Sequence, residues 1–431
     1  MHTTTSDHTL SAKYIAKEDQ YGAHNYHPLP AVLERGEGVF MWDVEGTRYF
    51  DFLSAYSAVN QGHCHPRIIG ALTKQAQKLT LTSRAFYNNL LGEAEEYMAK
   101  LFGYDKVLMM NSGVEAVETA MKLTRKWGYK VKGIPEYQAA ILFASGNFHG
   151  RTLSVISASN DPSSRTGFGP FMDGVSTVRY NDLASLEEAL AADPNVAGFI
   201  VEPIQGEAGV VIPDENYLRD AAALCKKYNV LFIADEIQTG IARSGRLLAT
   251  CGNCSCKGKC EDKKDVKADI LILGKALSGG VFPVSAVLAN DDIMLTIQPG
   301  EHGSTFGGNP LACAVAMEAL QVVIDENLAQ NADTMGELFR QGLRDIATRG
   351  SLITLVRGKG LLNAIVINCD EDDSLAWDIC MEFKANGLLA KPTHGNKIRL
   401  APPLVINAAQ VAEALHIIET SLEKFENRQL K

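Results

Sequence analysis

The chain has 431 residues, of which 46% are hydrophobic and 21% are charged, and its formal net charge at pH 7 is −10. These ordinary proportions exclude a disordered or fibrous protein, and the length favours two regions with cores of their own. The acidic balance would repel phosphate backbones and anionic lipids, so we expect neither nucleic acid nor a membrane surface as a partner. The longest apolar runs last about five residues, far short of the ~20 that cross a bilayer, so we expect no membrane span.

The first twenty residues lack the apolar core of a secretory signal and the Arg-rich bias of a mitochondrial presequence. We therefore expect a cytoplasmic protein, with the mitochondrial matrix as the alternative. Most of the nine cysteines stand singly in apolar or helical surroundings, which suits a reducing compartment.

The pattern along the chain predicts a large α/β domain over residues 61–310 and a smaller α+β domain over residues 311–431, which residues 1–60 are expected to join. Within the large domain, short continuous apolar runs are typical of strands buried on both faces of a parallel sheet. These runs cover residues 106–110, 139–144, 197–201, 229–234 and 269–274. Helix-like stretches separate them, so the sequence predicts a doubly wound, mostly parallel sheet with helices on both faces.

Polar residues follow several of these runs, at the strand ends where ligands of open α/β sheets gather. Glu202, Asp235 and Lys275 each come directly after an apolar run. Burial would lower the pKa of Lys275 and leave a neutral amine able to form a Schiff base with an aldehyde. A lysine that only reaches from the strand end to water is the alternative.

Two other parts of the sequence could bind the same aldehyde, namely Asp235 and the segment NSGVEAVETAMKL, which begins at Asn111. A carboxylate can keep the ring nitrogen of a pyridine aldehyde protonated, although an aspartate before a helix is also a common N-cap. The segment from Asn111 combines a strand end, a glycine turn and a helix start, where free N–H groups and the helix dipole favour a phosphate. A simple capped turn is the alternative there.

Six strings occur in order along the chain: NSGVEAVETAMK, NFHGRT, VEPIQGEAGV, IADEIQTG, LGKALSGG and HGSTFGGNP. Together they resemble the signature segments of class III aminotransferases. Further strings, such as YGAHNYHPLP, LTSRAFYNN and LLAKPTHG, are similar to the members of that family that act on ornithine, and the resemblance runs from about Tyr21 to Pro403.

The resemblance implies the pyridoxal 5′-phosphate (PLP) transferase fold of type I and a homodimer with shared active sites. It also implies an activity, the transfer of the δ-amino group of L-ornithine to 2-oxoglutarate. Transfer from N-acetylornithine, γ-aminobutyrate or a broader range of ω-amino acids is the alternative within the family. A catalytically silent relative that serves as a scaffold is the alternative outside it, and the presence of both Lys275 and Asp235 argues against that reading.

By resemblance, Lys275 would carry the cofactor and move the proton in catalysis, while Asp235 would pair with the ring nitrogen. The other implied cofactor contacts are the phosphate-binding Ser112, Gly113 and Val114, the ring-stacking Phe148, Gln238 near the ring hydroxyl, and Thr305 from the neighbouring subunit. Plain core packing is the alternative for Phe148.

The resemblance also assigns five substrate-binding residues. Tyr26 and Arg151 would hold the α-carboxylate of ornithine, and Tyr56 would narrow the pocket. Glu207 would pair with Arg399 while ornithine is bound and release it to hold 2-oxoglutarate, since an arginine that clamps a carboxylate must be masked for a basic substrate. A surface charge is the alternative for Arg399, and a core aromatic for Tyr56.

The chain departs from the family in a segment with Cys251, Cys254, Cys256 and Cys260. A reduced surface insertion, a disulfide or redox switch, and a thiolate metal site are all open readings of it. The string GHCHP at residues 62–66 belongs to the family pattern and is read as structural, so we assign no metal ligands.

Overall fold

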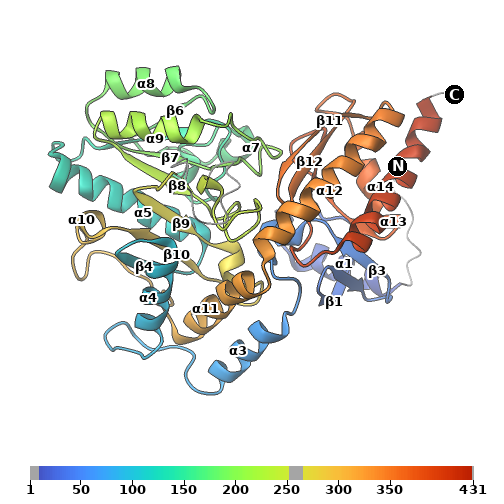
Figure 1. Cartoon of the computed structure of the whole chain (residues 1–431), viewed down its shortest axis with the longest axis horizontal. Coiled ribbons are helices and arrows are strands. Elements are labelled where there is room, and N and C mark those ends of the chain that lie inside the picture. Colours follow the sequence, from blue (N-terminus) through green and yellow to red (C-terminus); the bar gives the residue numbers. More distant parts are fainter. Residues whose placement is uncertain (1–8, 252–265, 430–431) are drawn as a thin grey trace.

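The computed structural model describes residues 9–251 and 266–429. They form a large and a smaller domain that lie side by side (Figure 1). Of the four clustered cysteines, Cys254, Cys256 and Cys260 lie outside the described residues, as does the side chain of Cys251. Their state therefore stays a prediction.

The large domain is built on a seven-stranded sheet with the order β4-β10-β9-β8-β7-β5-β6. The strands are β4 (Lys106–Met110), β5 (Ala140–Ala144), β6 (Val175–Val178), β7 (Val196–Val201), β8 (Leu231–Asp235), β9 (Ile270–Leu273) and β10 (Ser285–Ala289). Neighbouring strands are parallel except for β10, which is antiparallel to both of its neighbours. The prediction of a large, mostly parallel sheet is confirmed, and its five apolar runs coincide with five of these strands.

Two strands of this sheet, β6 and β10, were not predicted. The edge strand β6 has the sequence VSTV and is exposed at its two central positions, so it lacks a continuous apolar run. Strand β10 is fully buried but short and rich in small residues, and its sequence SAVLA reads equally well as part of a helix.

The central strands are buried on both faces because successive side chains point to opposite sides of a strand. Ile200 and Ile233 pack in one hydrophobic cluster with residues of α5 (Gly113–Trp127). Phe199 and Phe232, one position earlier in each strand, pack in a second cluster. That second cluster includes residues of α8 (Leu183–Ala192) and α9 (Tyr217–Lys227), so helices cover both faces as predicted.

The other helical segments before residue 326 lie before, between and after these strands along the chain. They are α1 (Leu10–Tyr21), α2 (Ser54–Ser57), α3 (Pro66–Ala76), α4 (Leu91–Phe102), η1 (Gly128–Lys132), α6 (Leu153–Ile156), α7 (Pro162–Arg165), η2 (Ala249–Cys251), η3 (Lys275–Ser278), α10 (Asp291–Met294) and α11 (Pro310–Asp325). Helix α11 packs against α3, α4 and η3. Within residues 9–251 and 266–429, no helix is both long and apolar enough to cross a membrane.

The smaller domain contains an antiparallel sheet with the order β11-β12-β15-β14, flanked by three helices (Figure 1). Its elements are β11 (Ile353–Lys359), β12 (Leu362–Ile367), β14 (Lys391–Pro392), β15 (Lys397–Leu400), α12 (Leu328–Arg349), α13 (Leu375–Ala385) and α14 (Ala408–Gln429).

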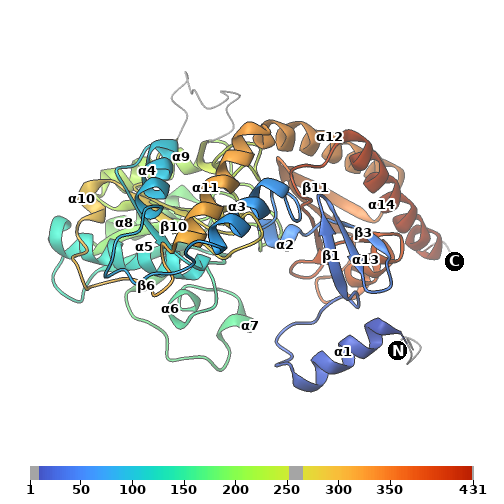
Figure 2. The same cartoon turned by 90° about the horizontal axis from the view of Figure 1, so that it is seen from below.

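A second four-stranded sheet brings the N-terminal segment onto the smaller domain. Strands β1 (Leu33–Glu37), β2 (Phe40–Asp43) and β3 (Arg48–Asp51) are followed in the sheet by β13 (Leu388–Leu389), which is parallel to β3. Helix α1 lies apart from both sheets (Figure 2), and none of its residues is buried.

Candidate active site

A cavity of ≈ 260 Å³ lies beyond the carboxyl ends of the central strands. Its walls come from the segments that follow β4, β5, β7, β8 and β9. Eight of the predicted site residues line it, namely Gly113, Val114, Phe148, Arg151, Glu207, Asp235, Gln238 and Lys275. Residues more than 160 positions apart in the sequence therefore share one cavity.

Lys275 follows β9 and begins η3 with a backbone φ of 40°, in the left-handed region that a non-glycine residue rarely adopts. Such backbone conformations cluster at active sites, where the surrounding structure enforces them. Burial lowers the pKa of the Lys275 amine, because the charged form loses its hydration. The neutral amine needed for covalent chemistry is thus favoured.

Asp235, at the end of β8, is held from two sides. Its Oδ2 atom lies 2.6 Å from Nδ1 of His149, and its Oδ1 accepts a hydrogen bond from the backbone N–H of Ile237 at 3.1 Å. Burial would lower the pKa of His149, but the hydrogen bond and charge of Asp235 raise it, and the imidazole orients the carboxylate. His149 stands in the string NFHGRT, yet the sequence reasoning gave it no role.

Glu202 is a second buried carboxyl group of the cavity. Unlike Asp235, it received no role from the sequence. Its Oε2 accepts the backbone N–H of Phe148 at 3.0 Å, which ties the segment after β5 to the end of β7. Burial, partly offset by His149, raises the pKa of Glu202 to about 8. Its protonated form is therefore the main form at neutral pH.

The start of α5 forms a polar rim on the cavity. Ser112 is the N-cap and makes a capping box with Glu115, so its hydroxyl is already engaged with the N–H of Glu115. The N–H groups of Gly113 and Val114 belong to the first helical turn and have no acceptor within the helix. A Cβ atom at Gly150 would lie 2.6 Å from Cγ2 of Val114, so glycine allows the segment after β5 to approach this turn.

Glu207 and Arg399 form an ion pair with 2.5 Å between Oε1 and Nη1. Arg399 lies on β15 of the smaller domain, so the site is built where the two domains meet. Gln238 donates to the same Glu207 oxygen at 2.9 Å. Burial would raise the pKa of Glu207, but the charges of Arg399 and Lys275 hold it below its usual value. The pair is ionised.

The amide oxygen Oε1 of Gln238 is buried and has no hydrogen-bond partner among the described residues. A Cβ atom at residue 206 would lie 1.5 Å from this oxygen, so Gly206 leaves room for the amide in its present position. An unpartnered buried acceptor at a cavity wall calls for a donor from a ligand.

Tyr56 approaches the ion pair from α2, a left-handed turn in which Ser54, Ala55, Tyr56 and Ser57 all have positive φ. The guanidinium carbon of Arg399 lies 5.1 Å from the centre of the Tyr56 ring. Burial and the charge of Glu207 raise the pKa of Tyr56.

Hydrogen bonds with Asp51 and Ala401 hold the start of the turn. Asp51 accepts the N–H groups of Leu53 and Ser54 at 2.9 and 2.8 Å, and the Ser54 hydroxyl donates to the carbonyl of Ala401 at 2.6 Å. These bonds stabilise a backbone conformation that is otherwise unfavourable.

Besides Tyr56 and Arg399, three predicted residues do not line the cavity. Ser112 is an exposed helix cap, Thr305 is exposed, and Tyr26 is 65% exposed although it lies near enough to Tyr56 to influence its pKa. The histidines of GHCHP pair with single carboxylates, His63 with Asp51 and His65 with Glu326. No set of three metal-binding side chains is found within the described ranges.

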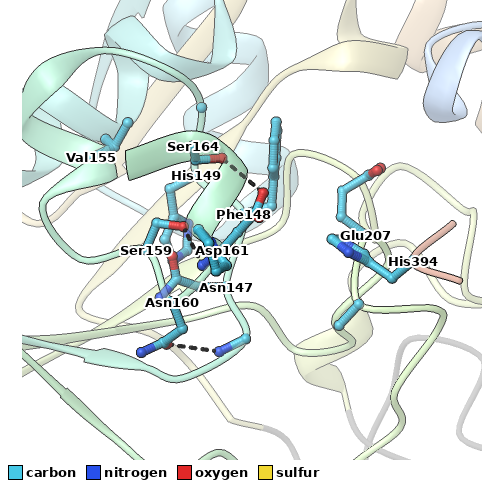
Figure 3. A pocket seen from close by; sticks show the side chains of 14 residues that line it. Asn147, Phe148, His149, Val155, Ser159, Asn160, Asp161, Ser164, Glu207 and His394 are labelled. Atoms are coloured by element: carbon cyan, nitrogen blue, oxygen red, sulfur yellow. Dashed lines mark hydrogen bonds between the residues drawn. The ribbon is translucent and has the colours of Figure 1, made fainter. Parts of the chain in front are cut away.

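A second cavity of ≈ 300 Å³ adjoins the first and shares Phe148, His149, Gly150 and Glu207 with it. Figure 3 shows Asn160, Asp161 and Ser164 on one side, with Glu207 and His394 on the other. Apart from Glu207, these residues were not singled out from the sequence, because polar residues in loops give no pattern that distinguishes a cavity wall from surface.

The cavity around Lys275 fits the expected cofactor. A buried, readily neutral amine suits an aldehyde, and a carboxylate fixed by an imidazole suits a ring nitrogen. A helix N-terminus suits a phosphate, and the Gln238 oxygen suits a ring hydroxyl that donates to it.

A sequence profile of the family described as aminotransferase class-III matches residues 21–422. The ornithine aminotransferase, mitochondrial, of Drosophila melanogaster is 61% identical over 420 residues, which are 97% of this chain and 94% of that protein. The enzyme of the same name from Rattus norvegicus is 61% identical over 416 residues, with 96% and 91% covered.

Two solved aminotransferase structures are also similar to this chain. An ornithine aminotransferase from Toxoplasma gondii, described with partial occupancy of PLP at its active site, is 47% identical with a TM-score of 0.92, covering 98% of this chain and 96% of that one. An acetylornithine aminotransferase from Elizabethkingia anophelis is 57% identical with a TM-score of 0.85, covering 96% and 99%.

Proposed function

The chain belongs to the class III aminotransferases, and from this membership we propose that it transfers the δ-amino group of L-ornithine to 2-oxoglutarate, giving glutamate 5-semialdehyde and glutamate. Relatives named ornithine aminotransferase, at 61% identity over nearly the whole chain, support the donor. The observation that carries the proposal is the Glu207–Arg399 ion pair beside Lys275, because one pocket must receive a dibasic and a diacidic substrate in turn.

PLP, the cofactor of class III aminotransferases, supplies an aldehyde that takes up the amino group and a protonated ring that withdraws electrons from the reacting carbon. Lys275 would hold it through Nζ, and Asp235, oriented by His149, would keep the ring nitrogen protonated. The N–H groups of Gly113 and Val114 would receive the phosphate. Phe148 would pack on the ring, and Gln238 would accept a hydrogen bond from the ring hydroxyl.

Lys275 is also the base of the reaction. Burial lowers the pKa of its amine, so Nζ, when it is not bound covalently, can accept the proton that leaves the δ-carbon of ornithine. Its place at the cavity wall keeps this proton transfer away from bulk water.

Glu207 and Arg399 would allow one pocket to bind the two substrates in turn. With ornithine bound, Glu207 masks the guanidinium charge, so that the basic arm meets a neutral pair. With 2-oxoglutarate bound, Glu207 moves aside and Arg399 clamps a carboxylate of that substrate with two hydrogen bonds. Tyr26 and Arg151 hold the α-carboxylate of ornithine, and Tyr56 limits the width of the pocket.

We place the complete site in a homodimer. Thr305 and Ser112 are exposed in a single subunit, as are the aromatic side chains of Phe86, Tyr87 and Phe306. Exposed apolar groups of this kind mark protein interfaces. The partner subunit's Thr305 would then complete the phosphate site.

The protein is expected to work in a reducing compartment, the cytoplasm or the mitochondrial matrix. Cys64, Cys225, Cys313, Cys369 and Cys380 are free thiols among the described residues. Relatives from Drosophila melanogaster and Rattus norvegicus carry the word mitochondrial in their names.

The test is a half-reaction with the PLP-loaded protein, in which conversion of bound PLP to its amine form is followed by absorbance. L-ornithine, N-acetylornithine and γ-aminobutyrate are added separately. Conversion by ornithine at least tenfold faster than by the other two, with glutamate 5-semialdehyde as product, is the expected result. Faster conversion by N-acetylornithine would favour the second candidate, which the Elizabethkingia anophelis structure suggests by its name.

A further inference from the structure

The guanidinium of Arg151 is held by a short chain of hydrogen bonds that leads away from the cofactor cavity. Its Nη1 donates to Oγ of Ser164 at 3.1 Å, and Oγ of Ser164 donates to Oδ2 of Asp161 at 2.9 Å. Ser164 is buried, whereas Arg151 is exposed. These hydrogen bonds therefore tie an exposed cation to a carboxylate through one hydroxyl group.

The carboxylate at the end of this chain is anchored. Asp161 is the N-cap of α7 and accepts the N–H of Ser163 at 2.9 Å and its hydroxyl at 2.7 Å. Burial would raise the pKa of Asp161, but the hydrogen bonds from Ser163 and Ser164 and the charge of His394 hold it below its usual value. The ionised carboxylate polarises the Ser164 hydroxyl toward accepting from a cation.

The loop that carries Asp161 and Ser164 is stiffened from within. Nη1 of Arg165 lies within hydrogen-bonding distance of the carbonyls of Ile156, Ser157 and Ser159, at 3.1, 2.8 and 3.2 Å. Its guanidinium carbon is 3.9 Å from the centre of the Phe171 ring. The hydroxyl that meets Arg151 therefore sits on a supported segment.

The contact also sets the direction of Arg151. With Nη1 on Ser164, the guanidinium carbon lies 5.5 Å from the centre of the Phe148 ring, and Arg151 lines the cavity that contains Lys275. Fixing an arginine side chain that is free in solution costs rotamer entropy, so a preset orientation favours binding of a carboxylate.

We propose that Ser164, held by Asp161, is a positioning residue that presets Arg151 for the α-carboxylate of the amino donor and so favours α-amino acids over simple diamines. The inference rests on the proposed function, which supplies the donor class. A purely local role, in which Asp161 only caps the short helix α7, is the competing explanation for the same bonds.

The two explanations predict different effects of a Ser164 substitution on donors with and without a carboxylate. 1,4-Diaminobutane is ornithine without its α-carboxylate, so it reacts at the same centre but makes no use of Arg151. Ser164→Ala is expected to raise KM for L-ornithine about 5- to 10-fold, the usual effect of one hydrogen bond, and to change kcat less than about twofold. The kcat/KM for 1,4-diaminobutane should stay within about twofold of the wild-type value.

Ser163→Ala is the matched control. Ser163 donates to the same Asp161 carboxylate from the same helix but does not contact Arg151. Both donors should react with this variant as with the wild type. An equal loss of activity for both donors in Ser164→Ala, or an unchanged KM for ornithine, would overturn the proposal. If Ser164→Ala does not fold, Asp161→Asn weakens the same chain and is judged by the same comparison.

A binding measurement separates this proposal from the assigned reaction. L-norvaline has the carbon chain and α-carboxylate of ornithine but no δ-amine, and calorimetry gives its Kd without turnover. We expect a Kd about 5- to 10-fold higher for Ser164→Ala than for the wild type or Ser163→Ala. Equal values for all three proteins would refute the role of Ser164. A wild type that binds L-norvaline but does not react with ornithine would refute only the proposed donor.

Discussion

Arg399 and Glu207 lie 192 positions apart in the sequence and in different domains, yet their side chains meet with 2.5 Å between Nη1 and Oε1. The Arg399 side chain is only 2% exposed, and its Nε has no hydrogen-bond partner among the described residues. Removing one partner of a buried ion pair leaves an uncompensated charge, which costs about 3–5 kcal/mol. The state of this pair therefore decides which charges the pocket accepts.

Glu207→Gln should separate the two half-reactions. The variant keeps the size of the side chain but leaves the charge of Arg399 unmasked, so kcat/KM for L-ornithine should fall about tenfold or more. The half-reaction with 2-oxoglutarate should stay within about threefold, because Arg399 remains available. Stopped-flow absorbance of each half-reaction measures both values.

Glu371→Gln is the control for this variant. Glu371 forms an ion pair with Lys397, which lies on the same strand as Arg399, but Glu371 is 72% exposed. It should change neither half-reaction. An equal loss of both half-reactions in Glu207→Gln would mean that Glu207 serves only the stability of the site.

Tyr56→Ile should raise activity toward γ-aminobutyrate relative to L-ornithine by widening the pocket. The backbone of Tyr56 has φ 60° and ψ 39°, a conformation that disfavours a β-branched residue, so the variant should also lose about 1–2 kcal/mol of stability. Tyr56→Asn removes the ring with less strain, because asparagine tolerates this conformation. The ratio of kcat/KM values for the two donors is measured, and an unchanged ratio in both variants would exclude Tyr56 as the selective residue.

Gly206→Ala should weaken cofactor binding about fivefold, because the new Cβ would lie 1.5 Å from Oε1 of Gln238 and displace the amide. The Kd for PLP is obtained by titrating the cofactor-free protein. Gly70→Ala, where a Cβ meets nothing within 4 Å, is the control and should bind PLP normally. Wild-type affinity in Gly206→Ala would show that the position of Gln238 is immaterial to the cofactor.

Glu202 should make the stability of the cofactor-free protein depend on pH. Burial raises its folded pKa from 4.5 to about 8, so between these values the folded protein holds a proton that the unfolded chain releases. Stability must then fall as pH rises through this window, by at most about 1.4 kcal/mol per pH unit.

Glu202→Gln mimics the protonated group and should remove this slope. Thermal unfolding of the wild type and the variant from pH 5.5 to 8 gives the difference between them, in which the other titrating groups cancel. A wild type that gains stability relative to the variant as pH rises would contradict a raised pKa for Glu202.

The sheet and the reactive strand ends could be predicted from the sequence because their signals are local. Buried strands need continuous apolar runs, and Lys275 and Asp235 directly follow two of them. The contact between Glu207 and Arg399 leaves no local trace, and only the family resemblance suggested it. The imidazole of His149 and the hydroxyl of Ser164 were missed for the same reason, since each acquires its partner only when distant segments come together.

The left-handed turn at Ser54–Ser57 constrains how this pocket can change over evolutionary time. Four successive residues occupy torsion angles that most side chains resist, and Tyr56 is one of them. A residue substituted at one of these positions must first be able to adopt these torsion angles, whatever its effect on substrate binding. The range of amino donors that related enzymes can accept is thus limited by these torsion angles as well as by the space available to the ligand.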